Sequence, residues 1–320
     1  MIMRRFGVIM AGGKGTRLWP ISNRQRPKQF MEIDGETLLR RTVNRAAKLP
    51  LDKVYVVTTR EQRDQAIRES PPAEVICEPE GKGTAGAVLF VARDIDLRWG
   101  DGIMVVFPCD HDLEDSREFS EAIETACNLA EKGYIAVLGV PAKYPETGYG
   151  YMRVADRPAE GWPVVEFVQK PDADRAEELV KQGSLWCTAI WAAKISVILE
   201  EYQRAMPLME GDSVEGAIIS KAENVVAVLA PIRWTDIGNY ERLADIMPKD
   251  HCGNAVKGNH VGIDTLNSVI YADGGTVVTV GVRDLVVAKW GDLVMVCPKD
   301  RAETLQQALV GVIERCDRRS

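Results

Sequence analysis

The chain has 320 residues, which is enough for one large domain or for one domain with a smaller companion. Hydrophobic residues make up 46% of the sequence and charged residues 27%, which is typical of a globular protein with a sizeable core. The formal net charge of −7 argues against a general nucleic-acid binder, because such proteins normally carry a basic surplus. A small anionic ligand held by a local group of cations remains compatible with this charge.

Cysteine usage and hydropathy indicate a cytoplasmic protein. The seven cysteines form no C-x-x-C pair and their number is odd, so neither a disulfide framework nor a thiolate zinc site is expected. The apolar run at residues 6–10 is too short for a signal peptide. No run in the sequence approaches the roughly 20 apolar residues of a membrane span. We therefore expect reduced thiols and neither a membrane nor a nucleic-acid partner.

The first half of the chain alternates between two kinds of segment. Short β-branched apolar runs predict strands at residues 6–10, 53–59, 73–78, 103–108 and 134–140. Apolar residues at helical spacing predict helices at residues 36–49, 84–95 and 116–133. This alternation predicts an α/β fold, a doubly wound and mostly parallel sheet with helices on both faces. Ligands of such sheets bind beyond the C-terminal ends of the strands.

The character of the sequence changes near Pro248. From there to Pro298, short apolar runs alternate with Gly and Asp turns, and no segment of helical period interrupts them. We predict a small β module, coiled like a short β-helix, and a terminal helix at residues 300–316. The expected division is a large domain over residues 1–247 and the β module with its helix over residues 248–320.

A glycine-rich, basic stretch follows the first predicted strand: AGGKGTRLWPISNRQRPKQF, residues 11–30. Glycines let a backbone approach a phosphate closely, and successive N–H groups then form an anion-binding concavity. The stretch lacks the ending of a P-loop, and Leu18 stands where a dinucleotide fingerprint requires its last glycine. A nicotinamide-binding Rossmann enzyme is therefore excluded. The glycines alone leave two interpretations open, a solvated tight turn and a phosphate cradle.

The pattern A-G-G-x-G-T-R-L-W-P-x-S-x-x-x-x-P-K-Q-F closely resembles the signature of mannose-1-phosphate guanylyltransferases, which belong to the sugar-1-phosphate nucleotidyltransferases. The resemblance extends over nearly the whole chain. It implies a Rossmann-like, GT-A-like catalytic domain that transfers GMP from GTP to α-D-mannose 1-phosphate, giving GDP-mannose and pyrophosphate. It also implies that the loop wraps the phosphates of the nucleotide, while Arg17 and Lys28 contact the triphosphate.

A second block, EPEGKGTAGAV at residues 78–88, is similar to the family segment that embraces the base. A carboxylate at Glu78 suits guanine, whose N1–H and N2 amine are both donors. Gly83 and Gly86 depart from the Asn and Pro of the family, and the segment on its own is a polar turn. The nucleotide-binding residues implied by the resemblance are Gly12, Gly13, Gly15, Thr16, Arg17, Lys28, Glu78 and Thr84.

Two further blocks imply a magnesium site. PCDH at residues 108–111 and WTDIGNY at residues 234–240 resemble the blocks that carry the metal ligands of the family. Asp110 and Asp236 would then hold Mg²⁺, a hard cation that prefers carboxylate oxygens and usually shares its coordination with substrate phosphates. His111 is expected to serve structure by orienting the aspartate. The alternative for an Asp at a strand end is a turn or helix cap.

The sugar side of the implied site departs from the family pattern. The usual F-V-E-K-P contains Gln169 in place of Glu, and the usual W-N-S-G block contains Cys187 in place of Asn. Both changes remove acceptors or donors for sugar hydroxyls, and an unpaired buried hydroxyl costs about 1–3 kcal/mol. The sugar-binding residues implied by the resemblance are Gly150, Gln169, Lys170, Cys187 and Glu215. The stretch around Glu215 could equally be a helix start capped by Ser213.

Catalysis of the implied reaction rests on positioning and charge neutralisation, with Arg17, Lys28 and Lys170 as the catalytic cations. Two alternatives to the mannose enzyme remain. One is a nucleotidyltransferase for a different sugar 1-phosphate, and the other is a weakly catalytic, regulatory GDP-sugar-binding homologue. The resemblance further implies a homodimer with contacts through the C-terminal module. At this length no fused isomerase domain is expected, and therefore no isomerase activity.

Overall fold

The computed structural model describes residues 3–13, 15–79, 81, 83–156, 161–206 and 213–302. The chain divides into two compact units, each made of separate stretches of sequence. The first unit comprises Met1–Gly12, Leu39–Cys109 and Leu113–Trp234, and the second comprises Gly13–Leu38, Asp110–Asp112 and Thr235–Ser320. Most of the terminal helix predicted at residues 300–316 lies outside the described residues.

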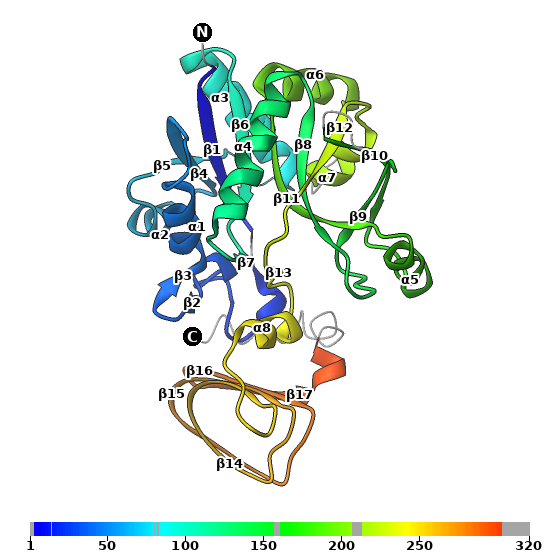
Figure 1. Ribbon diagram of the computed structural model, residues 1–320. Coiled ribbons are helices and arrows are strands. Elements are labelled where there is room, and N and C mark those ends of the chain that lie inside the picture. Colours follow the sequence, from blue (N-terminus) through cyan, green and yellow to red (C-terminus); the bar gives the residue numbers. More distant parts are fainter. Residues whose placement is uncertain are drawn as a thin grey trace. The chain divides into compact units, whose positions relative to one another are not determined.

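The first unit is built on one large sheet, and the predicted α/β fold is confirmed there (Figure 1). The strand order is β5-β4-β1-β6-β11-β8-β12-β10-β9. The first four strands in that order are mutually parallel: β5 (Glu74–Cys77), β4 (Lys53–Thr58), β1 (Arg5–Met10) and β6 (Ile103–Pro108). Strand β11 (Leu185–Lys194) then runs antiparallel to both of its neighbours in this order, β6 and β8 (Ile135–Pro141).

The strands that follow β8 in this order include parallel and antiparallel neighbours. Strand β12 (Val225–Leu229) is parallel to β8, whereas β10 (Trp162–Gln169) is antiparallel to β12 and to β9 (Gly150–Val154). Strand β9 also pairs with β11. This arrangement places the ends of β9, β10 and β11 beside one another.

Helices pack on the sheet through apolar side chains. One core cluster joins α3 (Gly83–Trp99) and α6 (Ile195–Ala205) to alternate strand residues such as Val8, Val106 and Val137. Helix α4 (Arg117–Glu131) packs on β8 and β11 outside that cluster, and Ser116 caps it by accepting a hydrogen bond from the Phe119 N–H. The remaining helices of this unit are α1 (Leu38–Ala46), α2 (Arg63–Glu69), α5 (Ala173–Lys181) and α7 (Val214–Ala217).

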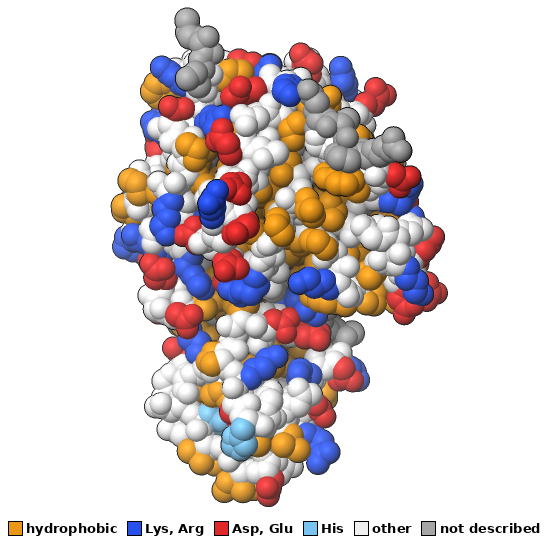
Figure 2. Space-filling view, viewed as in Figure 1, with side chains coloured by type: hydrophobic (Ala, Val, Ile, Leu, Met, Phe, Trp, Pro, Cys, Tyr) orange, Lys and Arg blue, Asp and Glu red, His pale blue; other side chains and the backbone are white. Residues whose placement is uncertain are grey.

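The second unit contains the predicted β-helix-like module (Figure 1). Strands β14 (Ala255–Ile263), β15 (Val269–Val280) and β16 (Leu285–Trp290) are parallel, so each turn of the chain returns beside the one before it. Strand β17 (Leu293–Pro298) closes the sheet in the antiparallel direction. Hydrophobic side chains also lie at the surface of this coil, and Figure 2 shows some of them. The exposed large apolar residues of its strands are Val261, Ile263, Val278, Val280, Val294 and Val296.

The glycine-rich stretch belongs to the same unit and shares its core. Leu18, Trp19 and Ile21 are buried in one cluster with helix α8 (Tyr240–Ile246) and with the inward side chains of the β module. The Tyr240 hydroxyl donates to the carbonyl oxygens of Leu18 and Trp19 at 3.1 and 3.0 Å. The loop is therefore anchored on its apolar side, which leaves its glycines and cations on the other. In the described part of the chain, no helix is long and apolar enough to cross a membrane.

Strand β11 contains one strained position. Its register against β8 shifts between Cys187 and Trp191, and Ala189 within this shift has a φ of 55°. The Thr188 hydroxyl supports the irregularity by donating to the Leu138 carbonyl at 2.8 Å and accepting from the Ile190 N–H. An L-residue in the left-handed region costs about 1–2 kcal/mol.

We predict that Ala189→Gly raises the free energy of unfolding by about 0.5–1 kcal/mol, because the relieved strain exceeds the extra chain entropy of glycine. Chemical denaturation measures the change. Ala193→Gly is the matched control, since Ala193 is a fully buried alanine of the same strand with no positive φ. This control should lower stability, and an equal loss in both variants would contradict the strain argument.

Candidate active site

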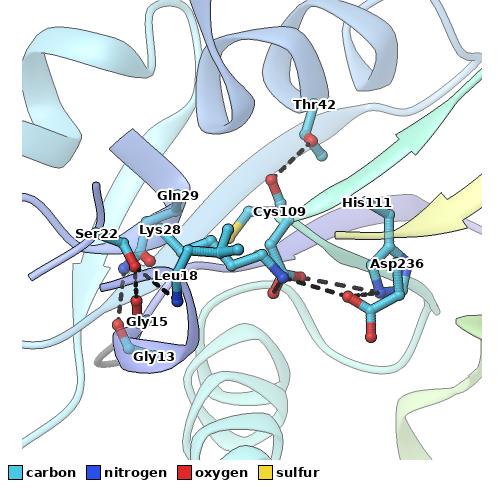
Figure 3. Close-up of polar contacts among 11 residues, drawn as sticks. Gly13, Gly15, Leu18, Ser22, Lys28, Gln29, Thr42, Cys109, His111 and Asp236 are labelled. Carbon is cyan, nitrogen blue, oxygen red and sulfur yellow. Dashed lines mark hydrogen bonds and ion pairs between the residues drawn. The ribbon is translucent and has the colours of Figure 1, made fainter. Parts of the chain in front are cut away.

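Two aspartates and a lysine from distant parts of the chain meet in the second unit (Figure 3). Asp110 lies between β6 and β7 (His111–Leu113), and Asp236 ends β13 (Trp234–Asp236), which pairs with β7. Lys28 Nζ lies 2.9 Å from Asp110 Oδ2 and 3.2 Å from Asp236 Oδ1. One ammonium group therefore bridges both carboxylates that the sequence assigned to a metal.

The electrostatics of this cluster favour the charged forms of Lys28 and Asp110. Burial opposes the charge on Lys28, but the carboxylates of Asp110 and Asp236 outweigh it and raise the pKa of the ammonium. Burial likewise opposes the charge on Asp110, but Lys28 and then His111 outweigh it and hold the pKa of this carboxyl well below its usual range. Asp110 is therefore a carboxylate at physiological pH, with oxygens that can accept a cation.

The same cluster fits a divalent metal. Asp110, His111 and Asp236 each offer one ligand atom, and these atoms lie within 4.8 Å of one another. His111 Nε2 is 3.9 Å from Asp110 Oδ1 and 3.8 Å from Asp236 Oδ1. The sequence predicted the two aspartates but gave His111 only a supporting role. No signal distinguished it, because a histidine beside an aspartate has no metal-binding spacing of its own.

The glycine loop is joined directly to Lys28. Gly15 has a φ of 58°, and a Cβ at this position would overlap the backbone nitrogen of Lys28, so only glycine allows this approach. Gln29 donates to the Gly13 carbonyl at 3.0 Å, and the Ser22 hydroxyl donates to the Gly15 carbonyl (Figure 3). These contacts fix the position of the glycine loop relative to the backbone of Lys28.

Arg17 lies in the same region, in the short 3-10 helix Thr16–Leu18. Its side chain is exposed. A Cβ on Gly238 would lie 3.7 Å from both Arg17 Nη1 and Asp236 Oδ2, which places the guanidinium near the metal-binding group. The side chain of Thr16, another predicted nucleotide contact, lies outside the described atoms.

The remaining predicted nucleotide residues belong to the first unit. Gly12 adjoins Glu78, since a Cβ on Gly12 would lie 2.9 Å from Glu78 Oε1. Glu78 is only 6% exposed, and its N–H donates to the Thr58 carbonyl at the end of β4. Thr84 begins helix α3, and its hydroxyl accepts a hydrogen bond from the Val214 N–H. Thr84 thus supports helix α7, the helix that carries Glu215.

The predicted sugar residues form a row across three strand ends of the first unit. Gly150 is the register partner of both Gln169 and Cys187. A Cβ on Gly150 would lie 2.6 Å from Gln169 Oε1 and 3.4 Å from the Cβ of Cys187. The two positions that depart from the family pattern therefore flank the same glycine.

Lys170 and Glu215 complete this group. Lys170 directly follows Gln169 with a φ of 48°, and its N–H donates to the Tyr149 carbonyl at 3.1 Å. Burial raises the pKa of Glu215, and hydrogen bonds and the charge of Lys170 only partly offset this rise. Burial, together with the Glu215 carboxylate, also raises the pKa of Cys187 to about 12, so its thiol is neutral. Ser213 caps helix α7 as the sequence suggested, accepting from the Gly216 N–H.

An aromatic cluster on this side of the unit was missed at the sequence level. The ring of Tyr149 packs against Trp186 and Trp234, with ring centroids 5.4 and 4.9 Å apart. Tyr144 packs on the other side of Trp186. The cluster lies at the start of strand β9, because Tyr149 directly precedes Gly150. Trp186 and Trp234 each begin a block that resembles the family, but nothing in the spacing links the four aromatic residues.

Comparisons with known proteins show which family the chain is similar to. The sequence model of a family described as nucleotidyl transferase matches residues 6–252, and that of a mannose-phosphate isomerase/GMP-like β-helix domain matches residues 258–310. The alginate biosynthesis protein AlgA of Pseudomonas aeruginosa is 32% identical over 94% of this chain and 71% of its own length. Mannose-1-phosphate guanylyltransferase 2 of Escherichia coli O157:H7 is 30% identical over 94% of this chain and 72% of its own length.

A solved structure shows that the similarity extends to the fold. The structure described as mannose-1-phosphate geranyltransferase from Thermus thermophilus is 33% identical in sequence to this chain. The match covers 98% of this chain and 100% of the other, with a TM-score of 0.89. The similarity therefore includes both the large sheet and the coiled β module.

The raised pKa of Glu215 yields a test of the sugar-side cluster. The folded protein holds this proton more tightly than the unfolded chain, so the ionised carboxylate lowers stability above its folded pKa. We predict that Glu215→Gln raises the free energy of unfolding near pH 7.5. This gain in the free energy of unfolding should disappear as the pH falls below 4.5, the ordinary pKa of a glutamate, because the wild-type carboxyl is then also neutral.

Denaturation at a series of pH values measures this difference. Glu200→Gln, a change at an exposed position of helix α6, is the matched control and should leave stability nearly unchanged throughout. A Glu215→Gln variant that is less stable than the wild type near pH 7.5 would refute the assigned burial.

Proposed function

The chain belongs to the nucleotidyl transferase family, and we propose that it transfers GMP from GTP to a sugar 1-phosphate, with α-D-mannose 1-phosphate as the first candidate. The observation that carries the proposal is the Lys28–Asp110–Asp236 cluster beside a glycine loop. Relatives named mannose-1-phosphate guanylyltransferase support guanine and mannose as the substrate groups. The products would be GDP-mannose and pyrophosphate.

The described residues fit distinct roles in an in-line displacement at the α-phosphorus of GTP. The backbone of the loop at Gly13 and Gly15 would bind phosphate oxygens, and Arg17 would neutralise the triphosphate together with Lys28. Asp110 and Asp236 would hold Mg²⁺, which when bound neutralises the charge that develops on the phosphates. A phosphate anion is already nucleophilic, so the site needs no base to activate it.

The first unit would supply the base and sugar contacts. Glu78, held at the end of β4, would accept the guanine donors. Lys170 would lower the repulsion between the two phosphates that approach each other. Gly150 lets the Gln169 amide come close to its backbone, since a Cβ there would lie 2.6 Å from Gln169 Oε1. Glu215 would accept from the sugar. These assignments follow the family pattern, and the grouping of the residues around Gly150 supports them.

A second candidate is transfer to a different sugar 1-phosphate. The specific observation in its favour is that Gln169 and Cys187 flank Gly150 from both sides. Gln169 replaces an acceptor oxygen with a donor amide, and the neutral Cys187 thiol is a weak hydrogen-bonding partner. Both changes fall where hydroxyl recognition would occur, whereas the triphosphate side keeps the full pattern.

We further propose a cytoplasmic homodimer with a catalytic part over residues 1–247 and a C-terminal module over residues 248–320. The described cysteines form no disulfide, which suits a reducing compartment. Exposed valines on β14, β15 and β17 offer the module an apolar face for a second copy.

Pyrophosphate release tests the proposed function. Each nucleoside triphosphate is paired with each of several sugar 1-phosphates, with Mg²⁺ or with a chelator. The proposal predicts metal-dependent release with GTP and mannose 1-phosphate. Release with another sugar only would support the second candidate, and no release with any pair would favour a regulatory homologue that binds nucleotide sugars.

The metal role of Asp110 makes a separate prediction. Asp110→Asn should lower the turnover rate by about 100-fold or more while the fold persists, because it removes a charged ligand of the metal that would neutralise the reacting phosphates. Asp34→Asn, at an exposed turn of the same unit, is the control and should keep the wild-type rate. Melting curves verify that both variants are folded. A near-normal rate in Asp110→Asn would remove this residue from the site.

A further inference from the structure

The position suited to a divalent cation is already bridged by a cation of the chain itself. Lys28 Nζ contacts one oxygen of Asp110 and one of Asp236, at 2.9 and 3.2 Å. The two carboxylates carry two negative charges, and the ammonium neutralises one of them. A bare divalent cation would therefore meet a site with a net charge of −1 and a fixed positive charge at its centre.

The lysine of this cluster is less exposed to solvent than its two aspartates. The Lys28 side chain is 7% exposed, whereas those of Asp110 and Asp236 are 35% and 25% exposed. A metal would thus approach the carboxylates from solvent while the lysine holds them from within. Because the Lys28 side chain is shielded from water, its repulsion of a second cation on the same carboxylates is screened only weakly.

The glycine loop offers Lys28 another anionic partner once a nucleotide is bound. The backbone of Gly15 lies against the backbone of Lys28, and Gln29 ties the same segment to Gly13. A triphosphate on this loop would therefore lie next to the base of the lysine side chain. Rotation of that side chain alone can exchange carboxylate oxygens for phosphate oxygens, because the segment itself is fixed.

We propose that Lys28 is the resident counter-ion of the metal site, so that the site rejects the bare divalent cation and accepts the metal–nucleotide complex as its substrate. The phosphates draw Lys28 off the carboxylates and deliver the metal to them in the same event. This inference rests on the proposed function in one respect, namely that Asp110 and Asp236 are the metal ligands.

The proposal has a thermodynamic consequence. If nucleotide removes the competing ammonium, then nucleotide strengthens metal binding, and by reciprocity metal strengthens nucleotide binding by the same factor. Coupling of this kind typically amounts to about 5–150-fold in affinity. Removal of the lysine charge should strengthen the binding of bare metal and shrink the coupling.

The test measures binding of bare Mn²⁺ from the electron paramagnetic resonance signal of the free ion, and binding of Mn²⁺ with GTP from the enhanced relaxation of water protons by the protein-bound ion. The full-length wild type is compared with Lys28→Met, and with Lys28→Gln as a second neutral variant. Without nucleotide, both should bind Mn²⁺ at least about fivefold more tightly than the wild type. Lys28→Arg keeps the charge and should bind bare Mn²⁺ as weakly as the wild type.

Two further variants serve as controls. Lys249→Met removes an exposed lysine that lies 4.0 Å from Asp245 in the same unit, and it should leave Mn²⁺ affinity unchanged. Asp236→Asn should weaken Mn²⁺ binding in the presence of GTP, which places the ion on this carboxylate. Melting temperatures give a second readout, because Mn²⁺ should stabilise Lys28→Met more than the wild type by compensating the two unneutralised aspartates.

Two results would overturn the inference, and they are distinguishable. If both neutral variants bind bare Mn²⁺ no more tightly than the wild type while Asp236→Asn weakens binding, Lys28 is not a competitor but the proposed function survives. If Asp236→Asn leaves Mn²⁺ binding with GTP unchanged, the metal assignment itself fails and the proposed function fails with it.

Discussion

The ion-pair bridge from Lys28 to Asp110 and Asp236 is the interaction on which the site depends. In the sequence, Lys28 is separated from Asp110 by 82 positions and from Asp236 by 208 positions. The bridge lies where the glycine loop, the end of β6 and the β7–β13 pair meet. The two carboxylates contact the same ammonium group, and they would repel each other without a cation between them. The fold supplies that cation from Lys28, which lies in the same segment as the glycines that we propose to bind phosphate.

Packing and hydrogen bonds on its apolar side hold the glycine-rich loop in its shape. Its apolar residues are buried with helix α8 and the β module, and the Tyr240 hydroxyl satisfies two of its carbonyl groups. The β module and the glycine-rich loop therefore share one core within the second unit. The sugar-side residues depend instead on the alignment of β9, β10 and β11, where strain at Ala189 and Lys170 is retained. Strained backbone of this kind persists only where its surroundings determine it strongly.

Sequence patterns predicted the regular part of the fold well. The runs at residues 6–10 and 103–108 are strands, and residues 116–133 contain helix α4, because buried periodicity is a local property. The antiparallel course of β11 could not be predicted, since strand direction is set by pairing with distant strands. The sequence likewise proposed Asp110, Asp236 and Lys28 separately, from family resemblance. It could not show that the lysine lies between the aspartates, because no local pattern encodes a contact across 208 positions.

A crystal structure with GTP and Mn²⁺, with anomalous scattering to locate the ion, would show whether the cluster binds the metal–nucleotide complex by exchanging Lys28 for the metal. We expect an anomalous peak coordinated by Asp110 and Asp236 and by phosphate oxygens, with Lys28 Nζ on the triphosphate. A peak remote from these carboxylates, or an ion bound there while Lys28 still bridges both of them, would rule out the exchange.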